Sequence, residues 1–318
     1  TAHTSAGSSP CAAAASRARL VAEALRELRV VQVAPVAQAP DRVVDRFGAV
    51  ALPRQALAEL HLGERATREE RERGLSGAAG GAVGHSGLIA HAARGFALAW
   101  QDWKWAEAEK EFKLALELDP GSADAHGAYA IAYLMPQGRI EQALAELKQA
   151  LDIDPNSVLT NLGYSYALLI AGQCDRAIGQ YRRTLELVPS RPDTWWDLGM
   201  AYACKGDSAG AMESFRKAGS MRGFADLRAG PIELGLDGQS DAGRKLAAQR
   251  GDAYFNRMRS IFAVYSLSVI GERDWAFRYL DKAMKERDPE LVWLKIDPRL
   301  KNLRDDPRIV PYLKQLGL

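Results

Sequence analysis

The chain has 318 residues and a formal net charge of +2; 47% of its residues are hydrophobic and 26% are charged. This is the composition of a folded globular protein, long enough for one extended repeat domain or two ordinary domains. The small net charge excludes the basic signature of a nucleic-acid-binding segment, and the most apolar stretch, Ile261 to Ile270, is far shorter than the roughly 20 residues of a membrane-spanning helix.

Residues 1–87 differ in composition from the rest of the chain. They contain no Lys, Met, Asn, Trp or Tyr, and their one aromatic residue is Phe47. Two interpretations stay open: a poorly ordered Ala/Arg/Gly-rich segment, or a fragmentary region translated from a G+C-rich gene out of frame. The second is favoured as a hypothesis, and it fails if neither other reading frame of the DNA continues the repeats found from residue 88 onward. The chain also begins with Thr1 rather than Met, so we expect it to be a fragment.

Local order is still expected within this region. The apolar residues between Ser16 and Leu28 follow a helical period, and Pro53 to Arg73 consists of helix-forming residues. Several glycines between Gly77 and Gly87 predict a flexible stretch before the next domain.

A repeated pattern occupies the chain from residue 88 and is clearest near residue 200. It consists of Trp195-Trp196-Asp197-Leu198-Gly199-Met200-Ala201-Tyr202, followed by Gly206, Ala211, Phe215 and Ala218. Gly199 and Ala211 are small enough to let two antiparallel helices approach closely, with larger residues around the contact. Gly206 suits the turn between the helices, because glycine tolerates left-handed backbone angles.

The same pattern recurs upstream at intervals of 34 or 35 residues. Prolines end the successive second helices, because proline lacks an N–H and disfavours helical geometry in the residue before it; they are Pro120, Pro155 and Pro189. The small residues at the helix contact are Ala108, Ala143 and Ala177, and the turns carry Gly138 and Gly172. The first turn, between Trp100 and Trp105, has one extra residue. A fixed period of this length predicts a stack of helical hairpins.

Two weaker repeats follow residue 222. Gly223 to Arg250 is centred on Gly238, with Pro231 interrupting its first helix, and Tyr254 to Lys285 carries Gly271 at its turn. Two Asp-Pro pairs come next, Asp297-Pro298 and Asp306-Pro307, and each is a favourable helix start. We expect the last helix, roughly Pro307 to Leu316, to cover the exposed face of the last repeat.

These motifs resemble tetratricopeptide repeats. The resemblance implies an all-α, right-handed solenoid of about six hairpins, with four clear repeats in residues 88–222 and two degenerate repeats and a capping tail in 223–318. The chain is similar in particular to the C-terminal region of bacterial regulators that carry an N-terminal winged-helix, cyclase or kinase domain. The residues behind this similarity are Asp102–Glu109, Trp293–Leu300, Leu303–Arg308 and Leu316–Leu318. No effector domain of that group is visible in the first 87 residues.

The sequence predicts no catalytic, cofactor or metal site. Gly84-His85-Ser86-Gly87 lacks the spacing of a hydrolase nucleophile elbow, and His85 and His91 do not share a helical face or acquire a partner at ligand spacing. Three widely spaced cysteines, Cys11, Cys174 and Cys204, with no CxxC pair predict reduced thiols and a cytoplasmic location.

The expected function is protein–protein interaction, because the first helices of such repeats line a concave groove that receives a peptide. Residues expected to face the groove are Phe96, Tyr129, Tyr133, Arg139, Tyr164, Trp196 and Met200. Trp196 and Met200 occupy positions where a peptide-carboxylate clamp would need polar residues, which disfavours that mode of binding. The runner-up hypothesis is a regulator or signalling protein whose effector domain is missing from this chain. Neither the partner nor the oligomeric state can be inferred.

Overall fold

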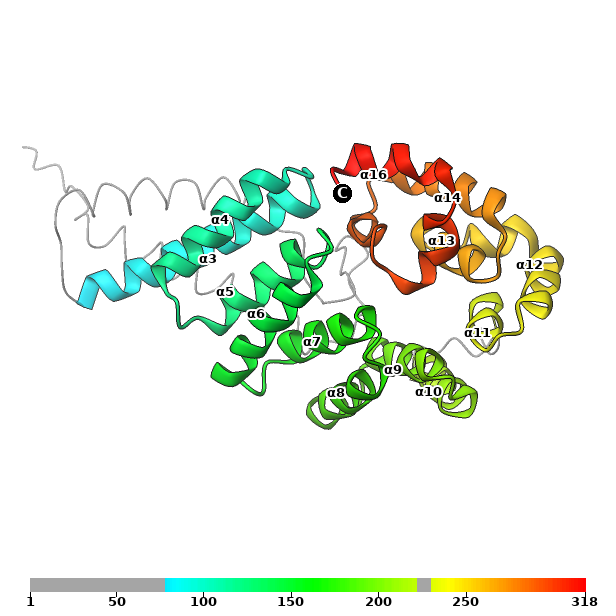
Figure 1. Cartoon of the computed structure of the whole chain (residues 1–318), viewed down its shortest axis with the longest axis horizontal. Helices are drawn as coiled ribbons and strands as arrows, with labels where there is room; N and C mark the ends of the chain where they lie inside the picture. Colours follow the sequence, from blue (N-terminus) through cyan, green and yellow to red (C-terminus); the bar gives the residue numbers. More distant parts are fainter. Residues whose placement is uncertain (1–77, 222–229) are drawn as a thin grey trace, which may run out of the picture. The chain divides into compact units, whose positions relative to one another are not determined.

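The structure, a computed structural model, describes residues 78–221 and 230–318. The helices expected in Ser16 to Leu28 and Pro53 to Arg73 lie outside these ranges. The chain divides into two compact units, residues 1–90 and 91–318, and the predicted repeats lie almost entirely in the second. Every regular element in the described ranges is helical (Figure 1).

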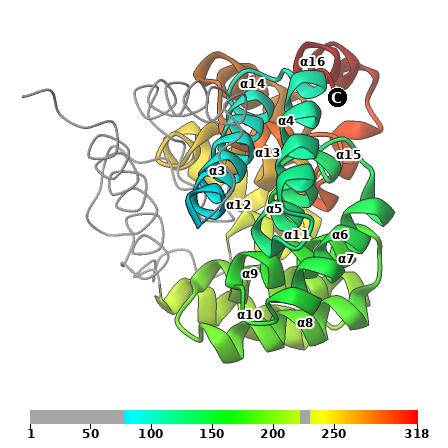
Figure 2. The same ribbon diagram turned by 90° about the vertical axis from the view of Figure 1, so that its left-hand side faces the viewer.

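The described helices pair into six consecutive hairpins, as the repeat pattern predicts. Hairpins 2 to 4 lie side by side in both ribbon views (Figures 1 and 2). In chain order, the hairpins are α3 (Ala78–Trp100) with α4 (Trp105–Leu118); α5 (Ala123–Tyr129), continued by the π-helical turn η2 (Ala130–Leu134), with α6 (Ile140–Ile153); α7 (Val158–Ile170) with α8 (Cys174–Leu187); α9 (Pro192–Lys205) with α10 (Ser208–Met221); α11 (Pro231–Leu236) with α12 (Ser240–Phe255); and α13 (Ser260–Val269) with α14 (Arg273–Glu286).

Two local expectations were wrong. Helix α3 begins at Ala78, so the stretch from Gly77 to Gly87 is not a flexible linker. Its several alanines favour helix enough to outweigh the glycines, each of which costs a helix only about 1 kcal/mol. Pro231 does not interrupt a helix but starts α11, because the first turn of a helix needs no N–H from that residue.

The two helices approach each other closely in hairpins 1 and 4. A Cβ atom added to Gly199 in α9 would lie 2.5 Å from the ring of Phe215 in α10. Gly95 in α3 stands in the same relation to Phe112 in α4, at 3.0 Å. The small residues that face these contacts are completely buried; they are Ala108, Ala143, Ala177 and Ala211. The predicted contact positions of the repeat are therefore confirmed.

Five hairpin turns use a glycine with positive φ. They contain Gly138, Gly172, Gly206, Gly238 and Gly271, with φ between 71° and 83°. In the first turn, which has the extra residue, Trp103 takes the left-handed conformation instead, with φ 58°. That conformation is unusual for a bulky residue. The ring of Trp103 lies under the guanidinium of Arg287, 4.3 Å from its centroid, which favours this position of the side chain.

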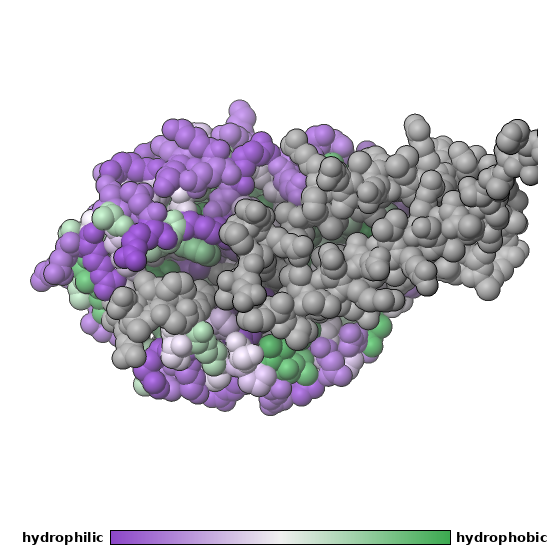
Figure 3. Space-filling view, turned by 180° about the vertical axis from the view of Figure 1, so that it is seen from behind, coloured by the Kyte–Doolittle hydropathy of each residue, from purple (hydrophilic) through white to green (hydrophobic). Residues whose placement is uncertain are grey.

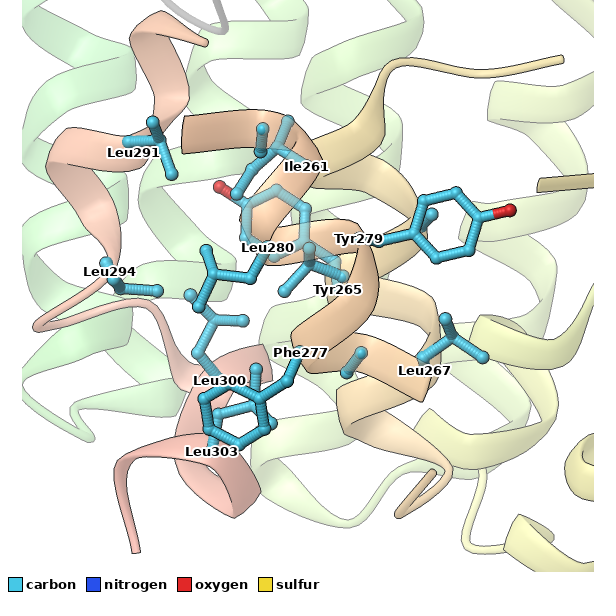
Figure 4. Packing of buried hydrophobic residues seen from close by; sticks show 14 of the residues in the cluster. Ile261, Tyr265, Leu267, Phe277, Tyr279, Leu280, Leu291, Leu294, Leu300 and Leu303 are labelled. Atoms are coloured by element: carbon cyan, nitrogen blue, oxygen red, sulfur yellow. The ribbon is translucent and has the colours of Figure 1, made fainter. Parts of the chain in front are cut away.

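The C-terminal segment, residues 289–318, consists of short helical turns packed against the last hairpin. Its elements are η4 (Pro289–Trp293), η5 (Pro298–Leu300), α15 (Lys301–Arg304), η6 (Pro307–Ile309) and α16 (Val310–Leu316). Leucines of this segment, including Leu291, Leu294 and Leu300, join α13 and α14 in one buried hydrophobic cluster (Figure 4). The expected covering of the last repeat is therefore present, and it begins well before Pro307.

Three Asp-Pro pairs, spaced nine residues apart, start the short helices of this segment. In each pair the aspartate carboxylate accepts a hydrogen bond from the backbone N–H two residues later, and proline occupies the first helical position. The pairs at Asp297 and Asp306 were expected from the sequence, and the one at Asp288 was not.

A disulfide joins Cys174 and Cys204, so the prediction of reduced thiols at these positions was wrong. Cys174 begins α8, Cys204 lies near the end of α9, and their Cα atoms are 5.8 Å apart. Stacking of hairpins 3 and 4 brings the two residues together although 30 positions separate them in sequence. The spacing rules that suggested free thiols cannot detect such a contact. Cys11 lies outside the described residues.

Replacing Gly199 by Ala should lower the free energy of unfolding by about 1–3 kcal/mol, because the added methyl group must displace Phe215. Gly179 in α8 is the matched control: it is exposed, and an added Cβ would meet no atom within 4 Å. Gly179→Ala should therefore raise stability slightly, by about 0.5–1 kcal/mol. Urea denaturation measures both values. Equal stability of the two variants would contradict the close-approach explanation.

Removing the disulfide by Cys204→Ser should lower the free energy of unfolding by about 2–4 kcal/mol, because the cross-link restricts the unfolded chain. The wild-type chain should lose the same amount in dithiothreitol, whereas the variant should not respond to the reductant. A thiol titration of the denatured, unreduced protein provides the direct check. Detection of three free thiols would show that the bond does not form.

Candidate functional site

The residues that could contact a partner are found by aligning the hairpins on their buried alanines. Counting back from Ala108, Ala143, Ala177 and Ala211, and allowing for the extra residue in the first turn, gives equivalent first-helix positions. These are Phe96, Ala132, Tyr166 and Met200. We call the side of hairpins 1 to 3 that carries Trp100, Ala132 and Tyr166 the inner face.

A proline shapes the middle of the inner face. Pro136 has no N–H, so the carbonyl of Ala132 cannot receive the usual hydrogen bond from four residues later. The helix widens to a π-helical turn here, with Met135 N donating to Ala130 O at 2.9 Å. The indole N–H of Trp100 donates to the carbonyl of Ala132 instead, at 3.2 Å. This bond fixes the Trp100 ring beside the second hairpin.

The side chain of Trp293, from the C-terminal segment, lies between Trp100 and Tyr166. Its ring is perpendicular to both: the centroids are 5.4 Å apart at 88° to Trp100 and 5.6 Å apart at 89° to Tyr166. Edge-to-face geometry of this kind stabilises aromatic pairs in addition to the stabilisation that comes from burying their surface. Trp293 has no exposed surface in this position.

Asp297 adds a polar contact one helical turn beyond Trp293. The hydroxyl of Tyr166 donates to its carboxylate at 2.8 Å. Arg299 donates to the same carboxylate from its backbone N–H, from Nε and from Nη2. Asp297 is completely buried, and such a charge is tolerated only when it is paired and hydrogen-bonded. Three donors from its own segment and one from the inner face meet this need.

Further contacts join the C-terminal segment and the residues before it to the first two hairpins. Lys295 Nζ donates to the carbonyl of Gln137 at 3.0 Å. The indole N–H of Trp105 donates to the carbonyl of Leu316 at 2.6 Å. Arg287 donates to the carbonyl of Gln101. These contacts come from the turns of hairpins 1 and 2, beside the inner face.

Four of the predicted groove residues lie on α3, α7 and α9. Phe96 is half-buried and stacks on Trp100, with 4.7 Å between ring centroids. Tyr164 is half-buried and accepts a hydrogen bond from Arg176. Trp196 is half-buried with its ring 4.7 Å from that of Phe215, and Met200 is buried. Their role in binding a partner stays a prediction.

The other three predicted groove residues gather around Glu109 of α4. Tyr133 donates to its carboxylate at 2.9 Å, Tyr129 at 3.3 Å and Arg139 at 2.9 Å. Tyr129 and Tyr133 are buried, with only 6% and 7% of their surface exposed, so little of either side chain remains for a partner. Their polar groups connect the first two hairpins.

This cluster perturbs the pKa values of its members. Partial burial acts to raise the pKa of Glu109, but hydrogen bonds from Arg139, Lys113 and Tyr133 outweigh it and hold the pKa at about 2. Burial and the neighbouring Glu109 charge raise the pKa of Tyr129 to about 12. The carboxylate therefore stays charged, and the phenol stays protonated, over the physiological pH range.

Residues that sequence reasoning missed are Trp100, Tyr166 and Trp293. Tyr164 was expected in the groove of hairpin 3, but Tyr166 is the residue that contacts the C-terminal segment. Alignment on Ala177 would have identified Tyr166, because it is as far from Ala177 as Met200 is from Ala211. No local signal could have assigned Trp293, whose partner Tyr166 belongs to a distant hairpin.

Other polar clusters support the hairpins. His91 contacts Glu111 at 2.7 Å, and His126 contacts Glu146, each pair linking the two helices of one hairpin. Within the described ranges, no group of three or more His, Cys, Asp or Glu residues is arranged to hold a metal ion. Among the residues placed in the structure, no helix has both the length and the apolarity needed to cross a bilayer.

The exposed apolar side chains are scattered. Those with the greatest exposure belong to separate helices; they are Leu114, Ile153, Met221, Phe262 and Val310. Figure 3 shows that, on one face of the molecule, the described surface is mainly hydrophilic with small hydrophobic patches. Single exposed apolar residues are normal on soluble proteins. The side chains that define the inner face are not among the exposed ones: Trp100 is 3% exposed, and Ala132 and Tyr166 are completely buried.

Comparison with known proteins identifies the repeats. Two tetratricopeptide-repeat models match residues 99–162 and 165–220. Similar solved structures include MamA, with 17% identity over 65% of this chain and 94% of that chain and a TM-score of 0.42. YrrB, described as a TPR protein with an unusual peptide-binding site, has 20% identity over 54% of this chain and 87% of that chain, with a TM-score of 0.41.

PilF from Pseudomonas aeruginosa has 20% identity over 70% of this chain and 99% of that chain, with a TM-score of 0.44. No curated protein matches the sequence. The similarity to winged-helix, cyclase or kinase regulators does not appear among these matches.

Replacing Glu109 by Gln should lower the free energy of unfolding at pH 7 by about 1–3 kcal/mol, because charge-assisted hydrogen bonds from Arg139 and Tyr133 are lost. The folded-state pKa of Glu109 is depressed, so its contribution is present above the unfolded pKa of about 4.3 and is lost as the pH falls towards 2. The variant should have a flatter stability profile over that window, measured by urea denaturation at several pH values. Glu107→Gln, on the exposed side of α4, is the control, and an equal effect of both changes would contradict this role.

Proposed function

Because residues 99–220 carry tetratricopeptide repeats, we propose that this chain is a non-catalytic scaffold that binds a peptide or protein partner along the first helices of its hairpins. Repeats of this kind generally hold other proteins, since stacked hairpins leave one side of their first helices available as an extended surface. Phe96 and Trp196 are half-buried there and offer aromatic area of the type enriched at protein interfaces.

The observation that carries the proposal is the contact between the inner face and the C-terminal segment. Trp100 and Tyr166 hold the indole of Trp293, and Tyr166 donates to the carboxylate of Asp297. A surface that binds one polypeptide segment through an aromatic side chain and a hydrogen-bonded carboxylate has the chemistry required for peptide recognition. This supports partner binding on the first helices without identifying the partner.

The alternative is a fragment of a bacterial regulator whose effector domain is missing from this chain. What favours it is a residue pattern, the resemblance to such regulators; Trp293–Leu300 is one of the four stretches that carry it, and it also contacts the inner face. In that case the repeats would form the sensing or assembly arm. The complete gene decides between the two, since an effector domain encoded upstream would establish the alternative.

The cytoplasmic location expected from the sequence depended on reduced cysteines. The bond between Cys174 and Cys204 removes that argument, because disulfides persist mainly in oxidising compartments.

Two adjacent tryptophans allow a matched test of the proposal. Trp196 lies at a predicted groove position, whereas Trp195 donates to the carbonyl of Pro189 and lies against Lys217. Both are half-buried in α9. Full-length wild-type, Trp196→Ala and Trp195→Ala chains should be used to capture proteins from the source organism, with the captured proteins quantified by mass spectrometry.

We expect the wild type and Trp195→Ala to capture a common set of proteins. Trp196→Ala should capture at least tenfold less of each of them, because the aromatic anchor is removed. Circular dichroism should first show that both variants are folded. Identical capture by all three chains would remove Trp196 from the binding surface. The absence of any captured protein above background would contradict the scaffold function itself.

A further inference from the structure

We propose that residues 293–297 act as a resident ligand of the inner face, and that this face takes partner segments in which a tryptophan precedes an acidic residue by four positions. The proposal rests on the scaffold function and specifies the chemistry of the partner. In the absence of the partner, the chain's own segment occupies the place where such a partner would bind.

The first argument is that the C-terminal segment uses different side chains for its own core and for the inner face. Leu291, Leu294 and Leu300 belong to the hydrophobic cluster of the last two hairpins and the segment itself, whose fully buried members all lie between Ala247 and Leu316. Trp293 is not part of that cluster and contacts Trp100 and Tyr166. The segment therefore keeps its own core through one set of side chains and contacts the inner face through another.

The second argument is the geometry of the bound residues. Asp297 N donates to the carbonyl of Trp293 at 2.9 Å, which closes a single helical turn. Residues four positions apart lie on the same side of such a turn, so the indole and the carboxylate reach the inner face together. Tyr166 contacts both groups: its ring faces the indole and its hydroxyl donates to the carboxylate.

The third argument is that the inner face has a shape suited to this ligand. Trp100 is fixed by its bond to the Ala132 carbonyl, which is available because Pro136 cannot donate to it. Trp100 and Tyr166 thus provide two rings that contact the bound indole edge to face. A peptide with an indole would make the same two contacts, and a carboxylate one turn later would meet the hydroxyl of Tyr166.

The contact buries its central groups completely: Trp293, Tyr166 and Asp297 have no exposed surface. A partner can therefore reach the inner face only when residues 293–297 leave it. A partner segment of the same chemistry would compete with residues 293–297. Its apparent affinity would be reduced by the fraction of chains in which the resident segment is bound.

The test uses full-length chains and a fluorescently labelled peptide that copies residues 289–300, Pro-Glu-Leu-Val-Trp-Leu-Lys-Ile-Asp-Pro-Arg-Leu. Binding is measured by fluorescence anisotropy. Trp293→Ala removes the resident indole while leaving the inner face intact, so this variant should bind the peptide at least tenfold more tightly than the wild type. Trp275→Ala, which removes an aromatic residue of α14 that contacts Phe255 and Asp252, should bind as the wild type does.

Two further controls examine the recognition itself. Adding Tyr166→Phe to Trp293→Ala should weaken peptide binding severalfold, because the hydroxyl that donates to the carboxylate is lost. A peptide in which the tryptophan is replaced by alanine should not bind any of the chains. Equal binding of the two peptides would overturn the proposal. The same holds if Trp293→Ala shows a cooperative thermal transition, and so is folded, but binds the peptide no more tightly than the wild type does.

If Trp293→Ala does not fold, hydrogen exchange of the wild type tests whether residues 293–297 leave the inner face. Amides of residues 293–297 should exchange at least tenfold faster than those of α14, because the segment leaves the inner face without unfolding of the last hairpin. If the amides of residues 293–297 and those of α14 exchange at the same slow rate, the proposal is overturned. Such a result would leave the scaffold function intact, because partner capture is tested separately through Trp196.

Discussion

The fold depends on one steric constraint, the close approach of two helices at a position where only a very small residue fits. Gly199 has no room for a Cβ beside Phe215, and the alanines at the facing positions are completely buried. The second helix of each of hairpins 1 to 4 supplies a completely buried alanine. The first-helix position of Gly199 varies more, with Ser165 in hairpin 3 and Ile131 in hairpin 2.

The inner face follows from how the hairpins differ at one equivalent position. Hairpin 2 has Ala132 where hairpins 1 and 3 have Phe96 and Tyr166. The missing N–H of Pro136 leaves a carbonyl for the indole of Trp100. A change of helix geometry at a single proline thus helps to position an aromatic site to which hairpins 1 to 3 contribute. The same residues that complete the fold are those from which we infer the chemistry of a partner.

The sequence predicted the hairpins well because their determinants are local. Turn glycines such as Gly138 and Gly206, and contact residues such as Ala143 and Gly199, act within one repeat and recur at a fixed interval. The candidate site was harder to predict. Counting along the helices from the signature positions led to Tyr164 rather than Tyr166 in hairpin 3, and a role of Tyr164, Tyr129 or Tyr133 in partner binding stays a prediction. The position of Trp293 and the pairing of Cys174 with Cys204 depend on stacking between repeats, which the local pattern does not encode.

The hydrogen bond from Trp105 to the carbonyl of Leu316 has a consequence for folding, because 211 positions separate the two residues. In a linear array of repeats, each unit touches only its neighbours, and the terminal units fray most easily. Here the first and last helical parts of residues 91–318 support each other directly, so fraying at one exposes the other. Long-range closure of this kind raises the mean sequence separation of contacts, which slows folding relative to an open array of the same length. The closed array therefore folds more cooperatively, but less rapidly and in fewer separate steps, than an open array of the same repeats would.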